Sequence, residues 1–113
     1  MDEVRWPGEW LRGVLELCVL GVLADGPTYG YAIAGRLADA GLGTVKGGTL
    51  YPLLARLEGD GLVSSSWHAG EGGPGRKYFA LTAAGRRELR TRARSWERFV
   101  DRTWRLIPRP EEE

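Results

Sequence analysis

The 113-residue chain contains a single histidine, His68, and a single cysteine, Cys18, and the two lie far apart in the sequence. Nucleophilic catalysis needs a nucleophile, a base and a group that orients the base, and a structural metal site needs several clustered ligands. No further member of such a set accompanies either residue. The sequence therefore predicts no enzyme, no metal site and no cofactor. His68 is expected to face water on a strand, and Cys18 to be a small buried residue.

The stretch from Lys46 to Leu62, KGGTLYPLLARLEGDGL, has chemistry of another kind. Its leucines recur at helical spacing, which predicts one buried face: Leu50, Leu53, Leu54 and Leu57. The opposite face has only small or cyclic residues: Gly48, Pro52, Ala55 and Gly59. A helix with such a bare face can enter the major groove of DNA, which is wide enough to hold it. The same face could instead pack on another helix of the protein.

Hydrogen-bonding groups surround this bare face. Thr49 and Tyr51 supply hydroxyl groups, and the start of the helix offers backbone N–H groups to a phosphate. The predicted DNA contacts in this stretch are Lys46, Gly47, Gly48, Thr49, Tyr51, Pro52 and Arg56. Three alternatives compete with this interpretation. Tyr51 could pack under the following hairpin, Lys46 could be merely solvated, and Arg56 could form an ion pair within its own helix.

The order of elements around this stretch is helix, helix, helix, hairpin, helix. Helices are predicted over residues 9–24, from a cap at Thr28 to about Ala40, and from Thr49, the expected cap of the third helix, to Gly61. A start of the third helix two or three residues earlier, with a slight kink at Pro52, is the alternative. Strands over 62–68 and 77–81 enclose a glycine-rich turn at 69–75. A final helix is predicted over 83–107. The fold class is therefore mainly α with a small β-hairpin, a winged helix-turn-helix followed by a long C-terminal dimerisation helix.

The hairpin is expected to form a wing beside the third helix. Its tip satisfies the pattern G-x-G-x-x-G, but a dinucleotide site needs that pattern between a strand and a helix, and here it joins two strands. Arg76 and Lys77, at the base of the wing, are expected to reach phosphates or the minor groove, although one of them could simply be exposed. Glu71, at the tip, would repel phosphate. Tyr29, at the start of the second helix, is chosen over Tyr31 as a phosphate contact.

The last predicted helix has an apolar stripe whose spacing alternates between four and three residues, as in paired helices. Nothing C-terminal remains to cover this stripe, and the first helix is apolar around most of its circumference. A homodimer is therefore expected. Its predicted interface residues are Leu11, Leu15, Cys18, Leu89, Ala93, Trp96, Val100, Thr103 and Ile107.

The charge balance constrains the expected partners only weakly, because the formal net charge is +1. Nine arginines lie from residue 82 onward, against six acidic residues. Most of these arginines are expected on the wet face of the last helix. Binding to DNA would then depend on local basic patches and on a dimer, and not on bulk charge. No apolar run approaches the ~20 residues that span a bilayer. A cytoplasmic location is expected, with no membrane partner.

Several motifs, in this order, resemble the PadR family of transcriptional regulators over nearly the whole chain. They are Leu11-Arg12-Gly13, Tyr29-Gly30-Tyr31, Gly48-Thr49-Leu50-Tyr51-Pro52, Arg56-Leu57-Glu58, and Gly75-Arg76-Lys77-Tyr78-Phe79 with Thr82 and Gly85. The resemblance implies a short-form homodimeric repressor that binds an inverted-repeat operator in double-stranded DNA and releases it when a small molecule binds. It implies domains at 1–82 for DNA binding and 83–107 for dimerisation, before an acidic tail at 108–113 without fixed structure.

The resemblance also suggests an effector site for a planar aromatic or phenolic compound. Trp96 corresponds to the position at which drug-binding members of the family stack planar ligands. The predicted lining residues are Trp10, Val14, Leu17, Trp96 and Val100. Plain interface packing of Trp96 is the alternative. Glu16 could pair with a cationic ligand or with a nearby arginine. For the whole chain, two alternative functions remain: a winged-helix module for protein interaction, and a drug-sequestering protein without an operator.

Overall fold

The computed structural model describes residues 5–70 and 72–111, and contains four helices and a three-stranded antiparallel sheet within them. The helices are α1 (Gly8–Ala24), α2 (Gly30–Asp39), α3 (Gly47–Gly59) and α4 (Ala83–Trp104). The strands are β1 (Thr28–Tyr29), β2 (Val63–Gly70) and β3 (Gly73–Leu81), in the sheet order β1-β3-β2. The predicted winged-helix class is confirmed. Glu71, Glu112 and Glu113 lie outside the described residues, and so do the expectations for the wing tip and the end of the tail.

One apolar core joins α1, α2, α3 and the base of the hairpin. All four leucines of α3 that the sequence assigned to its buried face are at most 3% exposed. They pack with residues such as Leu20 and Leu23 of α1, Ile33 and Leu37 of α2, and Val63 and Phe79 of the sheet. The four small residues of the opposite face of α3 are all exposed, as predicted: Gly48, Pro52, Ala55 and Gly59. The face is therefore free for a partner.

The N-cap residue of α3 lies three residues before Thr49, as in the alternative start that the sequence left open. Lys46 is its N-cap residue, and the N–H groups of Thr49 and Leu50 both donate to the carbonyl oxygen of Lys46 at 2.9 Å. Thr49 is therefore not the cap, and the earlier start, which places Pro52 beyond the first turn, is the one observed. Pro52 lies inside the helix on its exposed side, where water can satisfy the carbonyl group that lacks a donor.

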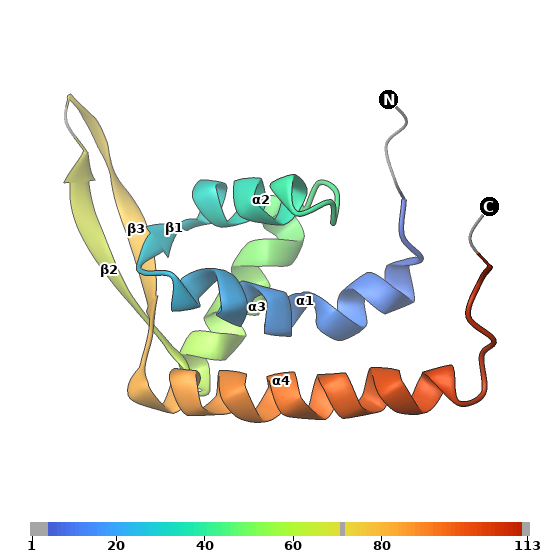
Figure 1. Ribbon diagram of the computed structural model, residues 1–113. Helices are drawn as coiled ribbons and strands as arrows, with labels where there is room; N and C mark the ends of the chain where they lie inside the picture. The colour runs from blue at the N-terminus through green and yellow to red at the C-terminus, as the bar shows by residue number, and fades with distance from the viewer. Residues whose placement is uncertain (1–4, 71, 112–113) are drawn as a thin grey trace.

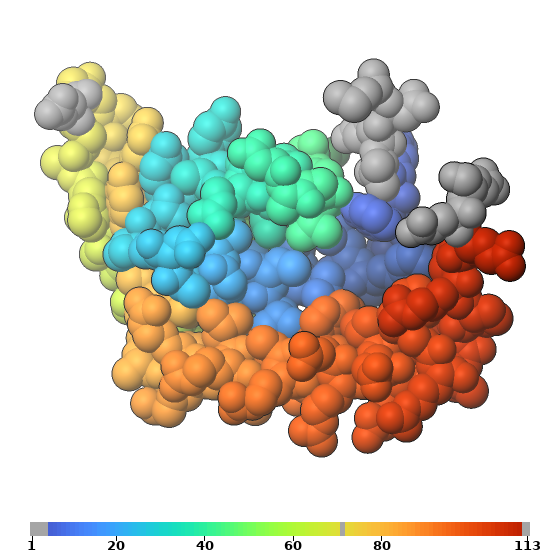
Figure 2. Space-filling model, in the orientation of Figure 1, coloured from blue at the N-terminus to red at the C-terminus, as the bar shows by residue number. Residues whose placement is uncertain are grey.

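Strand β1 and the length of the wing also differ from the prediction. Thr28 and Tyr29 do not start α2 but pair with Phe79 and Tyr78 of β3. The strands of the hairpin extend to Gly70 and from Gly73, so most of the glycine-rich segment is strand and not turn. In Figures 1 and 2 the wing projects beyond the body of the molecule at the upper left.

Helix α4 runs beneath α1 along the whole molecule (Figure 1). Thr82 caps it as predicted, since its Oγ1 accepts a hydrogen bond from the N–H of Gly85 at 3.0 Å. The helix ends at Trp104 and not at Ile107. Among the described residues, no helix is long and apolar enough to cross a membrane.

Candidate nucleic-acid interface

A groove of about 540 Å³ separates the start of α2 and α3 from the wing. It brings together four of the residues that the sequence assigned to DNA contact, namely Tyr29, Tyr51, Arg76 and Lys77. Three further residues complete the lining: Tyr31, Trp67 and Gly75. The groove therefore combines aromatic rings, hydroxyl groups and two cations, which are the groups that proteins direct at the sugars and phosphates of DNA.

Tyr51 projects from α3 into this groove and is 51% exposed. Its ring lies against Gly30 of α2, where a Cβ atom would come within 2.6 Å of Cζ. The alternative in which Tyr51 is buried under the hairpin is wrong, because the ring rests on α2 and keeps half of its surface open.

The start of α3 leaves the other predicted contacts exposed. Lys46, Gly47, Gly48, Thr49 and Pro52 all face solvent. The first N–H groups of a helix lack acceptors within it, and the helix dipole adds partial positive charge there. Lys46 adds a full positive charge. This end of α3 can therefore hold an anion such as a phosphate.

Tyr29 and Arg76 lie together on one face of the sheet. The guanidinium carbon of Arg76 is 4.5 Å from the centre of the Tyr29 ring, and that ring packs on Tyr78 at 5.4 Å. Tyr29 is half-buried, whereas Tyr31 is 81% exposed. Both tyrosines were expected at the start of the second helix, with Tyr29 as the phosphate contact. Tyr29 is a strand residue that packs on Tyr78, and Tyr31 is the more exposed of the two side chains.

Trp67 is the residue of the groove that sequence reasoning missed. It is 73% exposed on β2, and its cross-strand partner is Lys77. The register of the hairpin was the available signal, since a large aromatic residue opposite a lysine in the wing has no core to fill. His68 is exposed on the same strand, as predicted, and lies 3.0 Å from the Oγ of Ser66 through its Nε2.

Arg56 lies apart from this groove. Its Nη2 is 3.2 Å from Oε2 of Glu16, so Arg56 forms an ion pair with α1 and not within α3. Glu16 also accepts from Nη1 of Arg92 on α4 at 3.2 Å. Glu16 was expected to pair with a cationic ligand or with a nearby arginine, and in the structure it pairs with two arginines.

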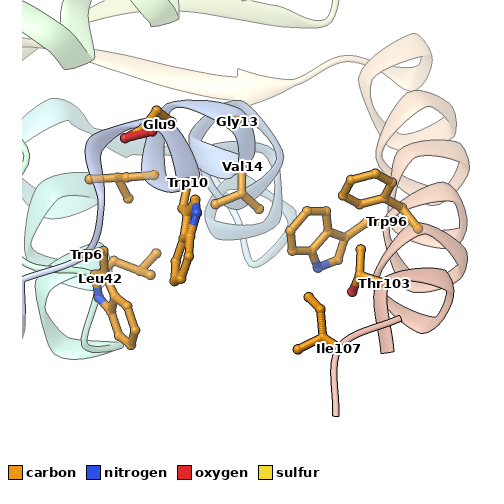
Figure 3. Close-up of a pocket in the computed structure, with 11 residues that line it drawn as sticks. Trp6, Glu9, Trp10, Gly13, Val14, Leu42, Trp96, Thr103 and Ile107 are labelled. Atoms are coloured by element: carbon orange, nitrogen blue, oxygen red, sulfur yellow. The ribbon is translucent and has the colours of Figure 1, made fainter. Parts of the chain in front are cut away.

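A second cavity, of about 710 Å³, lies between α1 and α4. Figure 3 shows Trp10 and Val14 of α1 facing Trp96 of α4 across it. Leu17 and Val100 do not line this cavity, although they were predicted to. Leu17 lines an adjoining hollow with Trp96, and Val100 is half-buried elsewhere on α4. The predicted set missed several lining residues: Trp6, Glu9, Leu11, Gly13, Leu42, Phe99, Thr103 and Ile107.

One of the predicted dimer residues is unavailable to a partner. Leu15 is 3% exposed and belongs to the core of its own chain. Leu11, Cys18 and Leu89 are also partly packed on that core. The whole-circumference apolar pattern of α1 concealed this, because the helix meets the core on one side and α4 on another.

Within the part of the chain that the structure describes, no group of three His, Cys, Asp or Glu residues could hold a metal ion. A hydrophobic core beneath an exposed helix, with a basic wing beside it, defines the winged helix-turn-helix class of DNA-binding proteins. Residues 19–91 match the transcriptional regulator PadR-like family, and the chain belongs to that family. Its members are transcriptional regulators and not enzymes.

Two known proteins are similar to this chain in sequence. The transcriptional regulator Rv3488 of Mycobacterium tuberculosis is 38% identical over 92 residues, which cover 81% of this chain and 84% of that protein. An uncharacterized 37.1 kDa protein in transposon TN4556 of Streptomyces fradiae is 38% identical over 89 residues. The match covers 79% of this chain but only 25% of the Streptomyces protein, so this chain corresponds to about a quarter of that relative.

Two solved structures have the same fold. A PadR family regulator from Eggerthella lenta is 40% identical, with a TM-score of 0.81 over 90% of this chain and 88% of that one. Bacillus subtilis PadR in complex with operator DNA is 25% identical, with a TM-score of 0.61 over 88% of this chain and 50% of that one. The chain is thus similar in fold to a regulator seen on its operator.

Proposed function

We propose that the protein is a homodimeric repressor that reads a pseudo-palindromic operator and releases it when a planar aromatic compound binds. The observation that carries the DNA-reading part is the groove between Tyr51 and the wing, beside the exposed start of α3. In a two-fold dimer each chain would place α3 in one half-site, and the half-site centres would lie about one helical turn apart, roughly 10 base pairs.

The dimer is supported by apolar surface that a single chain leaves open along α1 and α4. Trp10 is 66% exposed, Phe99 63% and Ile107 54%. Monomeric proteins rarely leave contiguous apolar patches of large size in contact with water. A second copy would cover the predicted interface residues of α4 and of the segment that follows it: Leu89, Ala93, Trp96, Val100 and Thr103, and then Ile107.

The effector is supported by the cavity between α1 and α4. Two indole rings, Trp10 and Trp96, face each other across it, and aromatic rings favour stacked or tilted neighbours (Figure 3). Because the cavity borders the expected dimer surface, a ligand there would also touch the partner. Its position suggests that binding changes the packing of α4 on α1.

An electrophoretic mobility shift with the promoter DNA upstream of the coding gene tests the operator. We expect a discrete complex that is competed by the same duplex but not by a scrambled one. Equal affinity for the scrambled duplex would overturn sequence-specific reading. In size-exclusion chromatography with light scattering, a mass of one chain at micromolar concentration would overturn the dimer.

Quenching of tryptophan fluorescence tests the effector. Ethidium and p-coumarate serve as a cationic and an anionic planar probe. We expect one of them to quench the fluorescence of the wild type and to bind Trp96→Ala much more weakly, with Trp104→Phe as the control outside the cavity. Affinity that is equal in Trp96→Ala would remove Trp96 from the site.

A further inference from the structure

Glu16 joins three helices through one carboxylate group. Its Oε2 accepts from Arg56 of α3, and its Oε1 accepts from Arg92 of α4, each at 3.2 Å. Glu16 itself belongs to α1, which lies above α4 in Figure 1, with α3 passing behind it. Arg92 is held from a second side by Glu88, whose Oε2 lies 2.9 Å from its Nε. The network therefore runs Arg56–Glu16–Arg92–Glu88, from the proposed DNA-reading helix to the helix that is expected to form the dimer interface.

This network is poorly suited to stabilising the fold. The side chain of Arg56 is 62% exposed and that of Glu16 is 33% exposed, and ion pairs this open to water contribute little to stability. What these ion pairs can do is fix the orientation of α3. The leucines of α3 anchor one face of the helix by apolar packing, which has little orientational preference. Charge-assisted hydrogen bonds fix an angle as well as a distance.

The orientation of α3 relative to α4 matters for a dimer. The separation of two half-sites on DNA must match the separation of the two reading helices. In the proposed dimer that separation depends on how rigidly each α3 is held relative to its own α4. Among the ion pairs of the described residues, those of Glu16 are the ones that connect α3 with α4.

The network also borders the cavity. One hollow is lined by Glu16 and Arg92 together with Trp96 and Phe99. Trp96 and Phe99 also line the cavity between α1 and α4. A shift of α4 against α1 therefore acts on the Arg92 side of Glu16. Because the same carboxylate holds Arg56, such a shift reaches α3.

We propose that Glu16 is a positioning residue that fixes the DNA-reading helix against the dimerisation helix, and so sets the separation of the two reading helices in the dimer. This inference rests on the proposed dimer. In this proposal Glu16 does not contact DNA. Its role is to restrict the range of α3 orientations that remains once the core and the hydrogen bond from Thr82 Oγ1 to the carbonyl oxygen of Gly61, just beyond α3, are in place.

Pulsed electron–electron double resonance on the free protein measures this separation without DNA. A spin label at Asp60→Cys, on the exposed end of α3, is placed in a Cys18→Ala background. We expect a narrow distance distribution between the two labels of a dimer. Glu16→Gln, Arg56→Met and Arg92→Met should each broaden it, and Glu16→Gln/Arg56→Met should broaden it no more than Glu16→Gln alone.

Asp25→Asn is the matched control, because Asp25 and Arg36 form a 2.7 Å ion pair that is exposed and does not involve α4. Its distribution should equal that of the parent, and all variants should keep the parental melting temperature. A narrow, unshifted distribution in Glu16→Gln would overturn the inference and leave the dimer intact. No dipolar coupling in the parent would overturn the dimer and, with it, the inference.

A second readout uses the operator found in the mobility shift. Duplexes with one base pair added to or removed from the centre of the operator should bind the wild-type protein more weakly than the unaltered operator does. We expect Glu16→Gln to reduce this spacing discrimination by about two- to thirtyfold, the usual range for coupling through a side-chain network. Equal discrimination in both proteins would count against the positioning role.

Discussion

Tyr51 of α3 packs against Gly30 of α2, at a contact between the two helices next to the proposed DNA groove. A Cβ atom at Gly30 would lie 2.6 Å from Cζ of Tyr51, which is closer than real side chains approach. The ring can occupy its place in the groove only because residue 30 has no side chain. The position of one proposed DNA contact is thus determined by a residue on the neighbouring helix.

Gly30→Ala should therefore impair DNA binding without unfolding the protein. The Tyr51 ring is half exposed and can swing away from the added methyl group, so the fold is retained. We expect a two- to tenfold loss of operator affinity, about the value of one hydrogen bond. Fluorescence anisotropy measures the affinity, and circular dichroism measures the melting temperature.

A double-mutant cycle distinguishes this mechanism from a direct effect of Gly30. In a Tyr51→Ala background, Gly30→Ala should cost nothing further. Additive losses from the two substitutions would show that Gly30 acts independently of the Tyr51 ring.

Gly85→Ala should destabilise the whole fold. A Cβ atom there would lie 3.0 Å from the backbone carbonyl carbon of Leu62, and backbone cannot move as a side-chain tip can. The same junction contains Thr82, whose hydroxyl donates to the carbonyl oxygen of Gly61 at 2.7 Å. We expect a loss of about 1–3 kcal/mol in the free energy of unfolding, measured with urea.

Gly35→Ala provides the control for this substitution. Gly35 lies within α2 and an added Cβ atom would meet nothing within 4 Å. Alanine is the better helix former, so we expect Gly35→Ala to be neutral or stabilising by up to about 1 kcal/mol. A comparable destabilisation by both substitutions would show that the contact with Leu62 is not the cause.

The parts of the fold that sequence predicted well are those with strong periodicity. The leucines of α3 specify one buried face, and the bare opposite face follows from the same spacing. Strand β1 could not be predicted this way, because two residues define no period. It forms only because Thr28 and Tyr29 meet β3, which is distant in sequence. This pairing leaves Tyr29 half-buried, whereas Tyr31 is exposed.

The errors at the candidate sites have a related cause. Leu15, Leu17 and Val100 were assigned from helical faces alone, and a face does not reveal which neighbour covers it. Leu15 meets the core of its own chain because α2, α3 and the sheet gather on that side of α1. The partner of Arg56 could not be predicted from a helical face either, because Glu16 is 40 residues away in the sequence.

Lys77→Ala should weaken binding to all DNA sequences by a similar factor. Lys77 lines the groove and offers a charge but no bidentate contact to a base. Each phosphate that loses its cation should reduce the slope of log affinity against log salt by about one. Titrations of operator and scrambled duplex at several salt concentrations measure this slope.

Arg36→Ala is the matched control for the loss of positive charge. Arg36 is exposed and paired with Asp25, away from the groove. We expect its salt slope to equal that of the wild type. If Arg36→Ala reduced the slope as much as Lys77→Ala, net charge and not the position of Lys77 would explain the effect.

Cys18 should report on the proposed dimer through its reactivity. Burial raises the pKa of the Cys18 thiol above its ordinary value, so less of the reactive thiolate is present at pH 8 than in an unfolded chain. We expect alkylation by iodoacetamide to be slower in the folded protein than in guanidinium chloride. Because a second copy would cover α1 further, the rate should fall as the protein concentration rises through the dimer dissociation constant. A rate that is independent of concentration over a range in which light scattering shows dissociation would place Cys18 outside the interface.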